Sequence, residues 1–349
     1  MIDKMPARRP RVWALLGAHQ GDNNQVLALA EALALPFERK NLTYNRWRHF
    51  QPWLLGATFR SLTKESRDLV SGDLPDLTIS TGHRSVPVVR AIRRRSAGRT
   101  RSVHLGYPRI SPVHFDLVVA TAEYPVPRGP HVMQIPLALT RGPTLANERD
   151  DDQLLCPFPR PRRLLILGGP TLYWRLDPND VLSAISQLEN EAAADSGSLL
   201  VVASPRTPRV ILSAAQKRLV DCQVPSLFVA TDGPPNYRTV LANADAIFVT
   251  ADSVAMISDA VSTGQPVSLV PIRPTRLGSA YMATIKLLMP GGRMYPRDLR
   301  HFWKEVTRCG FASFSESHLG NANGPLDLSA RVAERIRGML AGEDSVKSE

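Results

Sequence analysis

The stretch from residue 246 to residue 266 has the pattern of a strand, a polar turn and a helix. A helix N-terminus presents free N–H groups and a partial positive charge, so it suits a diphosphate. Asp252 and Asp259 are seven residues apart, which is about 10.5 Å along one face of a helix, and a carboxylate there could accept hydrogen bonds from ribose hydroxyls. The residues expected to contact such a ligand are Thr250, Asp252, Ser253, Met256 and Asp259. The alternative is that Asp252 or Ser253 only caps the helix and that Asp259 is a solvated surface residue.

Two more turns of this kind follow apolar runs in the second half of the chain. Gly168, Gly169 and Thr171 come after the run 164–167, and glycines there would let the backbone approach a phosphate closely. Ser204, Arg206 and Thr207 come after the run 198–203, where the planar guanidinium could bind an anion. Capping alone could explain any one turn, but it explains three successive turns less easily.

The first half contains two polar turns that could serve an acceptor. One carries His19, Gly21, Asp22 and Asn23, and in it Asp22 and His19 are the candidates for a catalytic base. The other turn carries Gly82, His83 and Arg84. A histidine in a loop is more often structural or solvated than catalytic, so that alternative stays open for both turns.

The segment 44–55 interleaves aromatic residues with basic ones, as in Arg46-Trp47-Arg48 and at Trp53. Such a mixture can bind nucleic acid or lie in a layer of lipid headgroups. The alternative is an ordinary amphipathic segment that packs its rings inward.

Strand-like and helix-like segments alternate along the chain, which predicts parallel α/β units. Before residue 163 this alternation is broken by a segment rich in proline and glycine, which contains the acidic run 150–152. We therefore expect an N-terminal Rossmann-like domain over 1–145, a linker over 146–162, a C-terminal Rossmann-like domain over 163–320, and a terminal helix with a frayed tail over 321–349. The amphipathic pattern of the terminal helix places Leu328, Val332 and Ile336 on one face.

The charge of the chain is uneven. Its formal net charge of +11 is almost entirely carried by residues 1–150, where 22 basic residues face 12 acidic ones, whereas residues 151–349 have 21 and 20. The basic half predicts a face for anionic lipid or a phosphate-bearing acceptor, and nucleic acid is the less favoured partner.

Several kinds of site are missing from the sequence. The three cysteines are far apart and form no metal-binding pattern, so we expect no metal and a reducing cytoplasmic environment. There is no phosphate-binding loop of the G-x-x-x-x-G-K-[ST] type, no G-x-G-x-x-G loop after the first strand, and no Tyr-x-x-x-Lys pair. No apolar run is long enough to span a membrane, so membrane contact would be peripheral.

Six segments occur in an order that resembles a known family: GAHQGDNNQ, PDLTISTGHRSVP, VHLGYPRISPVHFDLVV, LLILGGPT, ASPRTP and VTADSVAMISDAVSTGQPV. The family is the mitochondrial fission factor family known from the plant elongated-mitochondria protein, with many bacterial members, and the resemblance runs from about Val12 to Phe314. Its bacterial members are often labelled nucleoside-diphosphate-sugar epimerases, although the dinucleotide loop and the Tyr-x-x-x-Lys pair of such enzymes are absent here. The family is similar to GT-B glycosyltransferases, which implies two Rossmann-like domains facing a cleft, a terminal helix that crosses back to the N-terminal domain, and Asp259 on the donor ribose.

The resemblance implies a metal-independent glycosyltransferase at the cytoplasmic face of a membrane. A nucleoside-diphosphate sugar would be its co-substrate, with no other cofactor, and its acceptor would be lipid-linked or anionic. The alternative is a non-catalytic scaffold with the same fold that recruits partners to a membrane surface.

Overall fold

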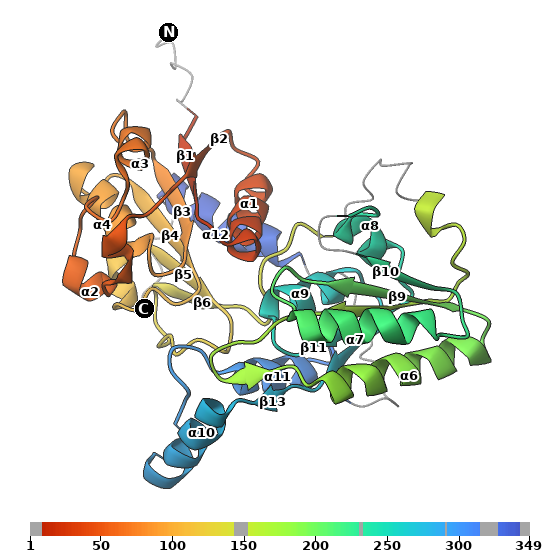
Figure 1. The fold of residues 1–349 in the computed structure, drawn as a ribbon. Helices are drawn as coiled ribbons and strands as arrows, with labels where there is room; N and C mark the ends of the chain where they lie inside the picture. Colours follow the sequence, from red (N-terminus) through yellow and green to blue (C-terminus); the bar gives the residue numbers. More distant parts are fainter. Residues whose placement is uncertain (1–8, 143–152, 230–232, 290–291, 315–326, 343–349) are drawn as a thin grey trace. The chain divides into compact units, whose positions relative to one another are not determined.

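The structure is a computed structural model that describes residues 9–142, 153–229, 233–289, 292–314 and 327–342. The chain divides into two compact units, Met1–Arg141 with Asp327–Glu349, and Gly142–Leu326. Each unit contains one parallel sheet with helices packed on it (Figure 1). Part of the predicted linker, residues 146–152, and its acidic run lie outside the described residues, as do the predicted tail residues 343–349.

The N-terminal unit is built on a six-stranded parallel sheet in the order β2-β1-β3-β4-β5-β6. The strands are β1 (Val12–Leu16), β2 (Phe37–Asn41), β3 (Leu77–Thr81), β4 (Arg101–Leu105), β5 (Leu117–Ala120) and β6 (Val132–Gln134). The helices are α1 (Gln20–Ala32), α2 (Pro52–Leu55), α3 (Lys64–Leu69), α4 (Val86–Arg95) and α12 (Leu328–Ala341), with short 3₁₀ turns η1 (Arg46–His49) and η2 (Pro112–His114).

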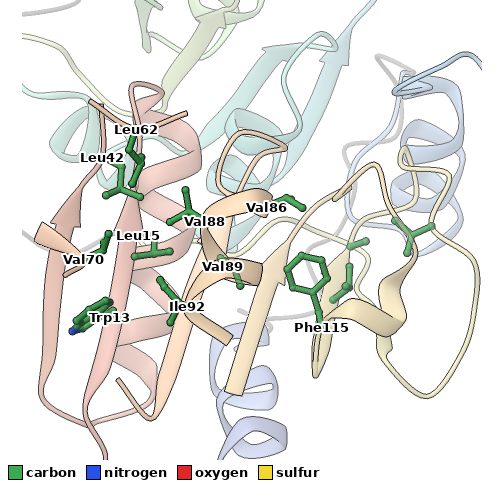
Figure 2. Close-up of a cluster of buried hydrophobic side chains, with 13 residues drawn as sticks. Trp13, Leu15, Leu42, Leu62, Val70, Val86, Val88, Val89, Ile92 and Phe115 are labelled. Carbon is green, nitrogen blue, oxygen red and sulfur yellow. The ribbon is translucent and has the colours of Figure 1, made fainter. Parts of the chain in front are cut away.

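The core of this unit lies where α4 packs against the sheet. All five residues of β1 are buried, as expected for a parallel strand with both faces covered. Figure 2 shows Trp13 and Leu15 of β1 beside Val89 and Ile92 of α4, all within one buried cluster.

The terminal helix α12 packs on α1, which confirms the prediction that it crosses back to the N-terminal domain. Leu328, Val332, Ile336 and Met339 are buried along one face, as the amphipathic pattern predicts. The Arg337 guanidinium donates to the carbonyl oxygen of Ala32 at the end of α1, at 3.3 Å. The last helix of the chain therefore completes the core of the first unit.

Replacing Ile336, which is fully buried, should test this packing. We expect Ile336→Ala to lower the free energy of unfolding by about 3 kcal/mol, because it removes buried methyl groups and leaves a cavity. Urea denaturation followed by tryptophan fluorescence measures the loss. The exposed Arg331→Ala on the same helix should change stability by less than about 0.5 kcal/mol. Equal effects of the two substitutions would show that α12 does not contribute to this core.

The C-terminal unit has a five-stranded parallel sheet in the order β10-β9-β7-β11-β12. Its strands are β7 (Arg162–Leu167), β9 (Ser198–Ala203), β10 (Ser226–Val229), β11 (Ala246–Thr250) and β12 (Val267–Val270), and the short strands β8 (Trp174–Arg175) and β13 (Arg273–Pro274) pair separately. Its helices are α6 (Pro178–Ala194), α7 (Arg209–Val220), α8 (Tyr237–Ala242), α9 (Val254–Ser262), α10 (Arg276–Leu288) and α11 (Leu299–Arg308). The predicted α/β class with two Rossmann-like sheets is thus confirmed.

Two elements differ from what the hydrophobic periodicity predicts. The apolar periodicity of residues 26–33 predicts a helix that starts near Asn24. Helix α1 begins four residues earlier, at Gln20, and the Asn23 side chain in its first turn bonds both the amide and the carbonyl of Gly17 at 2.8 Å. Strand β2 was not predicted, since its sequence FERKN is charged and its side chains are largely exposed. Among the described residues, none of the helices is long and apolar enough to span a bilayer.

Candidate functional site

The order of the strands places the predicted turns side by side in each unit. In the C-terminal sheet the chain runs from β7 to β9 and β10 on one side, and then returns to β11 and β12 on the other. The carboxyl ends of β7 and β11 therefore flank a topological switch point, which is where open parallel sheets bind their ligands. The turns after β9, β7 and β11, which carry the predicted donor residues, are consecutive along this edge.

Asp252 connects two of these turns through a buried set of hydrogen bonds. Its carboxylate accepts from the Thr250 hydroxyl at 2.6 Å and from the Gly169 amide at 2.9 Å. The Thr250 hydroxyl oxygen in turn accepts from the Gly168 amide at 2.8 Å. Asp252 is only 2% exposed, and this burial raises its pKa, while the Thr250 and Gly169 donors act in the opposite direction.

The two glycines are required by this arrangement. A Cβ atom on Gly168 would lie 2.2 Å from the Asp252 carboxylate oxygens, and one on Gly169 would lie 2.4 Å from the carbonyl oxygen of Arg206. Both amides are already bonded to side chains of this chain. Close approach of the protein's own groups therefore explains Gly168 and Gly169, and a ligand phosphate would have to use other donors.

Arg206 is the exposed group among the residues that meet in these turns. Its guanidinium is 52% exposed and lies 3.5 Å from the Asp252 carboxylate. Thr207 is buried and donates to the carbonyl oxygens of Leu167 and Gly168, and its hydroxyl oxygen accepts from the Ser204 amide. Thr171 closes a separate turn with Trp174 through backbone and hydroxyl bonds. Ser204, Thr207 and Thr171 thus build the turns, and Arg206 is placed to reach a ligand.

Helix α9 begins at Val254, two residues after Asp252, although a helix face shared with Asp259 requires Asp252 to lie within the helix. Ser253 is its N-cap and accepts from the Met256 amide at 3.4 Å, so Asp252 lies before the helix. The inference that Asp252 and Asp259 share a helix face is therefore wrong. Its cause is the side chain of Asp252, which bonds across to the β7 turn instead of continuing the helical direction. Met256 is partly exposed in the first turn.

Asp259 lies about one turn beyond Met256 in α9 and faces α8. Burial raises its pKa to about 7, while the Arg238 charge and the Tyr237 hydroxyl act to lower it. Asp259 as a whole is partly exposed, and a pKa near 7 means that its carboxyl changes charge near neutral pH. Tyr237 and Arg238 were not predicted from the sequence, because no short-range spacing connects α8 to α9.

Trp303 supports the same edge from α11. Its indole N–H donates to the carbonyl oxygen of Ala251 at 2.8 Å, and its ring packs edge-on against Trp174 with centroids 4.9 Å apart. This contact holds the turn between β11 and α9 from outside. The amphipathic pattern of α11 marks Trp303 only as a packing residue.

The N-terminal unit repeats the arrangement at its own switch point, between β1 and β3. Asp22 in the first turn of α1 lies next to Gly82, because a Cβ atom at that glycine would be 4.0 Å from the Asp22 carboxylate. Gly82 follows β3 with a φ of +72°, a conformation that glycine adopts most easily. The two predicted acceptor turns therefore meet, while His19 and Gly21 are exposed at the rim and Asn23 bonds Gly17.

His83 sits in a positive environment beside this turn. Burial, Arg109 and Arg84 together lower its pKa to about 4, so it is neutral at physiological pH. Arg109 follows β4, which pairs with β3, and it also donates to the Gln51 side chain at 3.4 Å. Arg109 lies in the segment VHLGYPRISPVHFDLVV, which carries part of the family resemblance, but no contact was predicted for it from the sequence.

An NMR titration of the imidazole should show this environment directly. We expect His83 to titrate near pH 4 and Arg109→Gln to raise its pKa part of the way toward 6.5, since burial is the larger cause. The exposed Arg128→Gln is the matched control and should leave the titration unchanged. If Arg109→Gln leaves the His83 pKa unchanged, the two residues are not close to each other.

Within the segment 44–55, Tyr44 packs against the buried core of its unit, whereas the other aromatic rings do not pack inward. Trp53 is 68% exposed, and Trp47, Phe50 and Leu54 are also exposed. Through Gln51 and Arg109, this segment adjoins the basic turns of the same unit. The inward-packing alternative is therefore wrong for these side chains, which leaves an apolar and basic face in the N-terminal unit.

Comparison with known proteins decides the family. A model described as mitochondrial fission ELM1 matches residues 20–340. The chain belongs to this family. The mitochondrial fission protein ELM1 of Arabidopsis thaliana is 27% identical to the chain over 318 residues, which cover 82% of the chain and 69% of the plant protein.

Solved structures resemble this ELM1 family member in fold. UDP-GlcNAc 2-epimerase from Methanocaldococcus jannaschii has a TM-score of 0.51 at 10% identity and covers 94% of this chain and 99% of its own. UDP-GlcNAc 2-epimerase from Neisseria meningitidis, bound to UDP-GlcNAc, has a TM-score of 0.50 at 12% identity and covers 95% and 100%. The chain therefore has a GT-B-like fold. Because proteins of this fold include epimerases, the missing dinucleotide loop and Tyr-x-x-x-Lys pair do not exclude an epimerase.

The described residues hold no group of three or more His, Cys, Asp or Glu side chains arranged to bind a metal ion. Their three cysteines are free thiols.

Proposed function

We propose that the C-terminal unit binds a nucleoside-diphosphate sugar and that the protein transfers the sugar to an acceptor, as a metal-independent glycosyltransferase. The observation that supports this proposal most is the coincidence of the β7/β11 switch point with the predicted turns. Arg206, the N-terminus of α9 and Asp259 lie on this edge, and together they offer a cation, backbone donors and a carboxylate. A nucleoside diphosphate needs these groups for its phosphates and its ribose.

The diphosphate would be held by Arg206 and the first turn of α9. Ser253 already satisfies the Met256 amide through its side chain and the Ile257 amide through its carbonyl oxygen. The amides of Val254 and Ala255, which have no partner within the helix, would then be the donors of this turn to an anion. The helix dipole and the guanidinium would stabilise the leaving diphosphate without a metal.

Asp259 would bind the ribose hydroxyls through its ionised carboxylate, with Tyr237 and Arg238 setting its orientation. Gly168, Gly169, Thr250 and Asp252 would shape the pocket by holding the turns together rather than by contacting the donor.

The N-terminal unit would hold a lipid-linked or anionic acceptor. His83 and Arg84 would face its anionic group, and Asp22, with His19 at the rim, would take the proton from its hydroxyl. The exposed aromatic segment and the basic charge of this unit would bring it to anionic lipid at the cytoplasmic face of a membrane.

Thermal-shift measurement against a panel of UDP, GDP, ADP and dTDP sugars tests the donor site. We expect one donor class to raise the melting temperature, and Asp259→Ala to abolish that rise. The exposed Asp221→Ala in the same unit is the control and should respond like the parent. If no donor stabilises the protein, the enzyme proposal fails, and NMR of the bound sugar would separate transfer from epimerisation at C2.

A non-catalytic scaffold is the second candidate, and one observation favours it. Asp252 and both glycines have a structural use within the protein, so their presence does not require a ligand. The fission-factor family is also known for a role in mitochondrial fission, as the name of the plant relative states. Under this alternative, no nucleotide sugar would bind.

A further inference from the structure

Helix α10 (Arg276–Leu288) is fixed to its unit mainly at its first turns. Thr275 caps it by accepting from the Gly278 amide at 3.0 Å, and the Thr275 amide donates to the carbonyl oxygen of Tyr173 at 2.9 Å. A Cβ atom on Gly278 would lie 2.2 Å from that carbonyl oxygen, so the helix touches the backbone there. Tyr281 stacks on Tyr173 with ring centroids 5.3 Å apart. Figure 1 shows the rest of α10 extending away from the sheet of its unit.

The free side of α10 is apolar. Leu277 is 54% exposed, Leu287 80% and Leu288 71%, and Met289 at the C-cap is 64% exposed. Leu287 and Leu288 follow Leu277 by ten and eleven residues, which is about three helical turns, so the three side chains share one side of the helix. Within α10, only Gly278 and Ile285 are buried. A cluster of exposed leucines of this kind marks an interaction surface.

The sequence around α10 carries charge of one sign. Between Asp259 and Asp298 the sequence has five basic residues and no acidic residue. Arg276 directly precedes Leu277 and Lys286 directly precedes Leu287, both cations are exposed, and neither forms an ion pair with the carboxylates that the structure describes. The surface therefore combines apolar side chains with cations whose charge is not neutralised locally.

We infer that α10 is a membrane-docking helix that inserts Leu277, Leu287, Leu288 and Met289 among lipid tails while Arg276 and Lys286 bind anionic headgroups. Apolar insertion together with flanking cations is the combination that holds amphipathic helices at an anionic interface. A second copy of the chain fits less well, because a two-fold contact through this helix would set Arg276 and Lys286 against the same cations. This surface lies in the C-terminal unit and is distinct from the aromatic segment of the N-terminal unit.

Flotation of the full chain with vesicles tests this inference, using phosphatidylcholine alone or with about one-third phosphatidylglycerol. We expect binding to the anionic vesicles that weakens with salt. The double substitution Leu287→Ser with Leu288→Ser should lower the partition coefficient about tenfold or more, and Arg276→Glu with Lys286→Glu should remove the preference for anionic lipid. The altered side chains are exposed, so the melting temperature should stay unchanged.

Two matched variants make the outcome decisive. Val220→Ser removes an exposed aliphatic side chain elsewhere in the same unit, 84% exposed, and should float like the parent. Trp53→Ser tests the aromatic segment. Parent-like flotation of the double leucine variant, or a loss of flotation confined to Trp53→Ser, would overturn the inference. A concentration-dependent dimer in light scattering that the leucine substitutions dissolve would overturn it as well. Because no nucleotide sugar is present, the result is independent of the proposed donor site.

Discussion

Asp252→Ala should unfold at a markedly lower urea concentration than the parent, with a loss of about 3 kcal/mol in the free energy of unfolding. The substitution removes the acceptor of the Thr250 hydroxyl and of the Gly169 amide, both of which are buried. Each unsatisfied buried donor costs about 1 to 3 kcal/mol.

The comparison of Asp252→Asn with Asp252→Ala separates hydrogen bonding from charge. Asn keeps one carbonyl acceptor, so we expect its loss of stability to be about half that of Ala. Burial raises the pKa of Asp252 above its ordinary value of 3.8, so the folded state holds this proton more tightly than the unfolded chain. The free energy of unfolding of the parent should therefore fall as the pH rises from about 3.8 through the raised pKa, and this fall should be smaller in Asp252→Asn, which lacks the contribution of Asp252. Identical denaturation midpoints for the parent and Asp252→Ala would refute the assigned hydrogen bonds.

Asp259→Asn should remove a pH dependence of donor binding that the parent shows near neutrality. Burial raises the pKa of Asp259 to about 7, and only the ionised carboxylate can accept from two ribose hydroxyls. Between one pH unit below and one above this pKa, the ionised fraction rises about tenfold, and the association constant should rise with it. Isothermal titration calorimetry with the stabilising nucleotide sugar at pH 6 and pH 8 measures this change.

The same group contributes to stability with the opposite sign. Because its folded pKa lies above the ordinary 3.8, the unfolding free energy of the unliganded protein should decline as the pH rises from about 4 to 7. In Asp259→Asn the rise in binding should be absent and the decline should be smaller, since Asp252 still contributes to it, whereas Asp221→Ala should retain both in full. Donor affinity that is equal at pH 6 and pH 8 in the parent would show that Asp259 does not contact the ribose as a carboxylate.

Hydrophobic periodicity was sufficient for most of the fold. Apolar runs such as 164–167 predicted buried strands, and the spacing of Leu328, Val332 and Ile336 predicted the packed face of the terminal helix. Strand β2 was not predicted because its charged sequence has no hydrophobic pattern. As an edge strand it is stabilised by backbone pairing with β1, and that pairing cannot be seen in the sequence.

The candidate site was predicted less completely. The turns after β7, β9 and β11 were recognised from their composition, since parallel strands bring their carboxyl ends to one edge. The prediction that Asp252 and Asp259 share a helix face was wrong. Helical spacing applies only to residues inside a helix, and α9 begins after Ser253. Tyr237, Arg238, Arg109 and Trp303 reach the two sites from other elements, so no local pattern marked them.

The sequence by itself determined the α/β class, the charge difference between the two halves and the turns that could bind an anion, because these depend on local order and composition. Only the tertiary structure decided which polar groups are already used within the protein. Asp252 became a buried hydrogen-bond acceptor for the turn after β7, while the Arg206 guanidinium beside it stayed half-exposed. The physical reason is that a polar group in a fold must first satisfy its buried neighbours, and those neighbours come from distant parts of the chain.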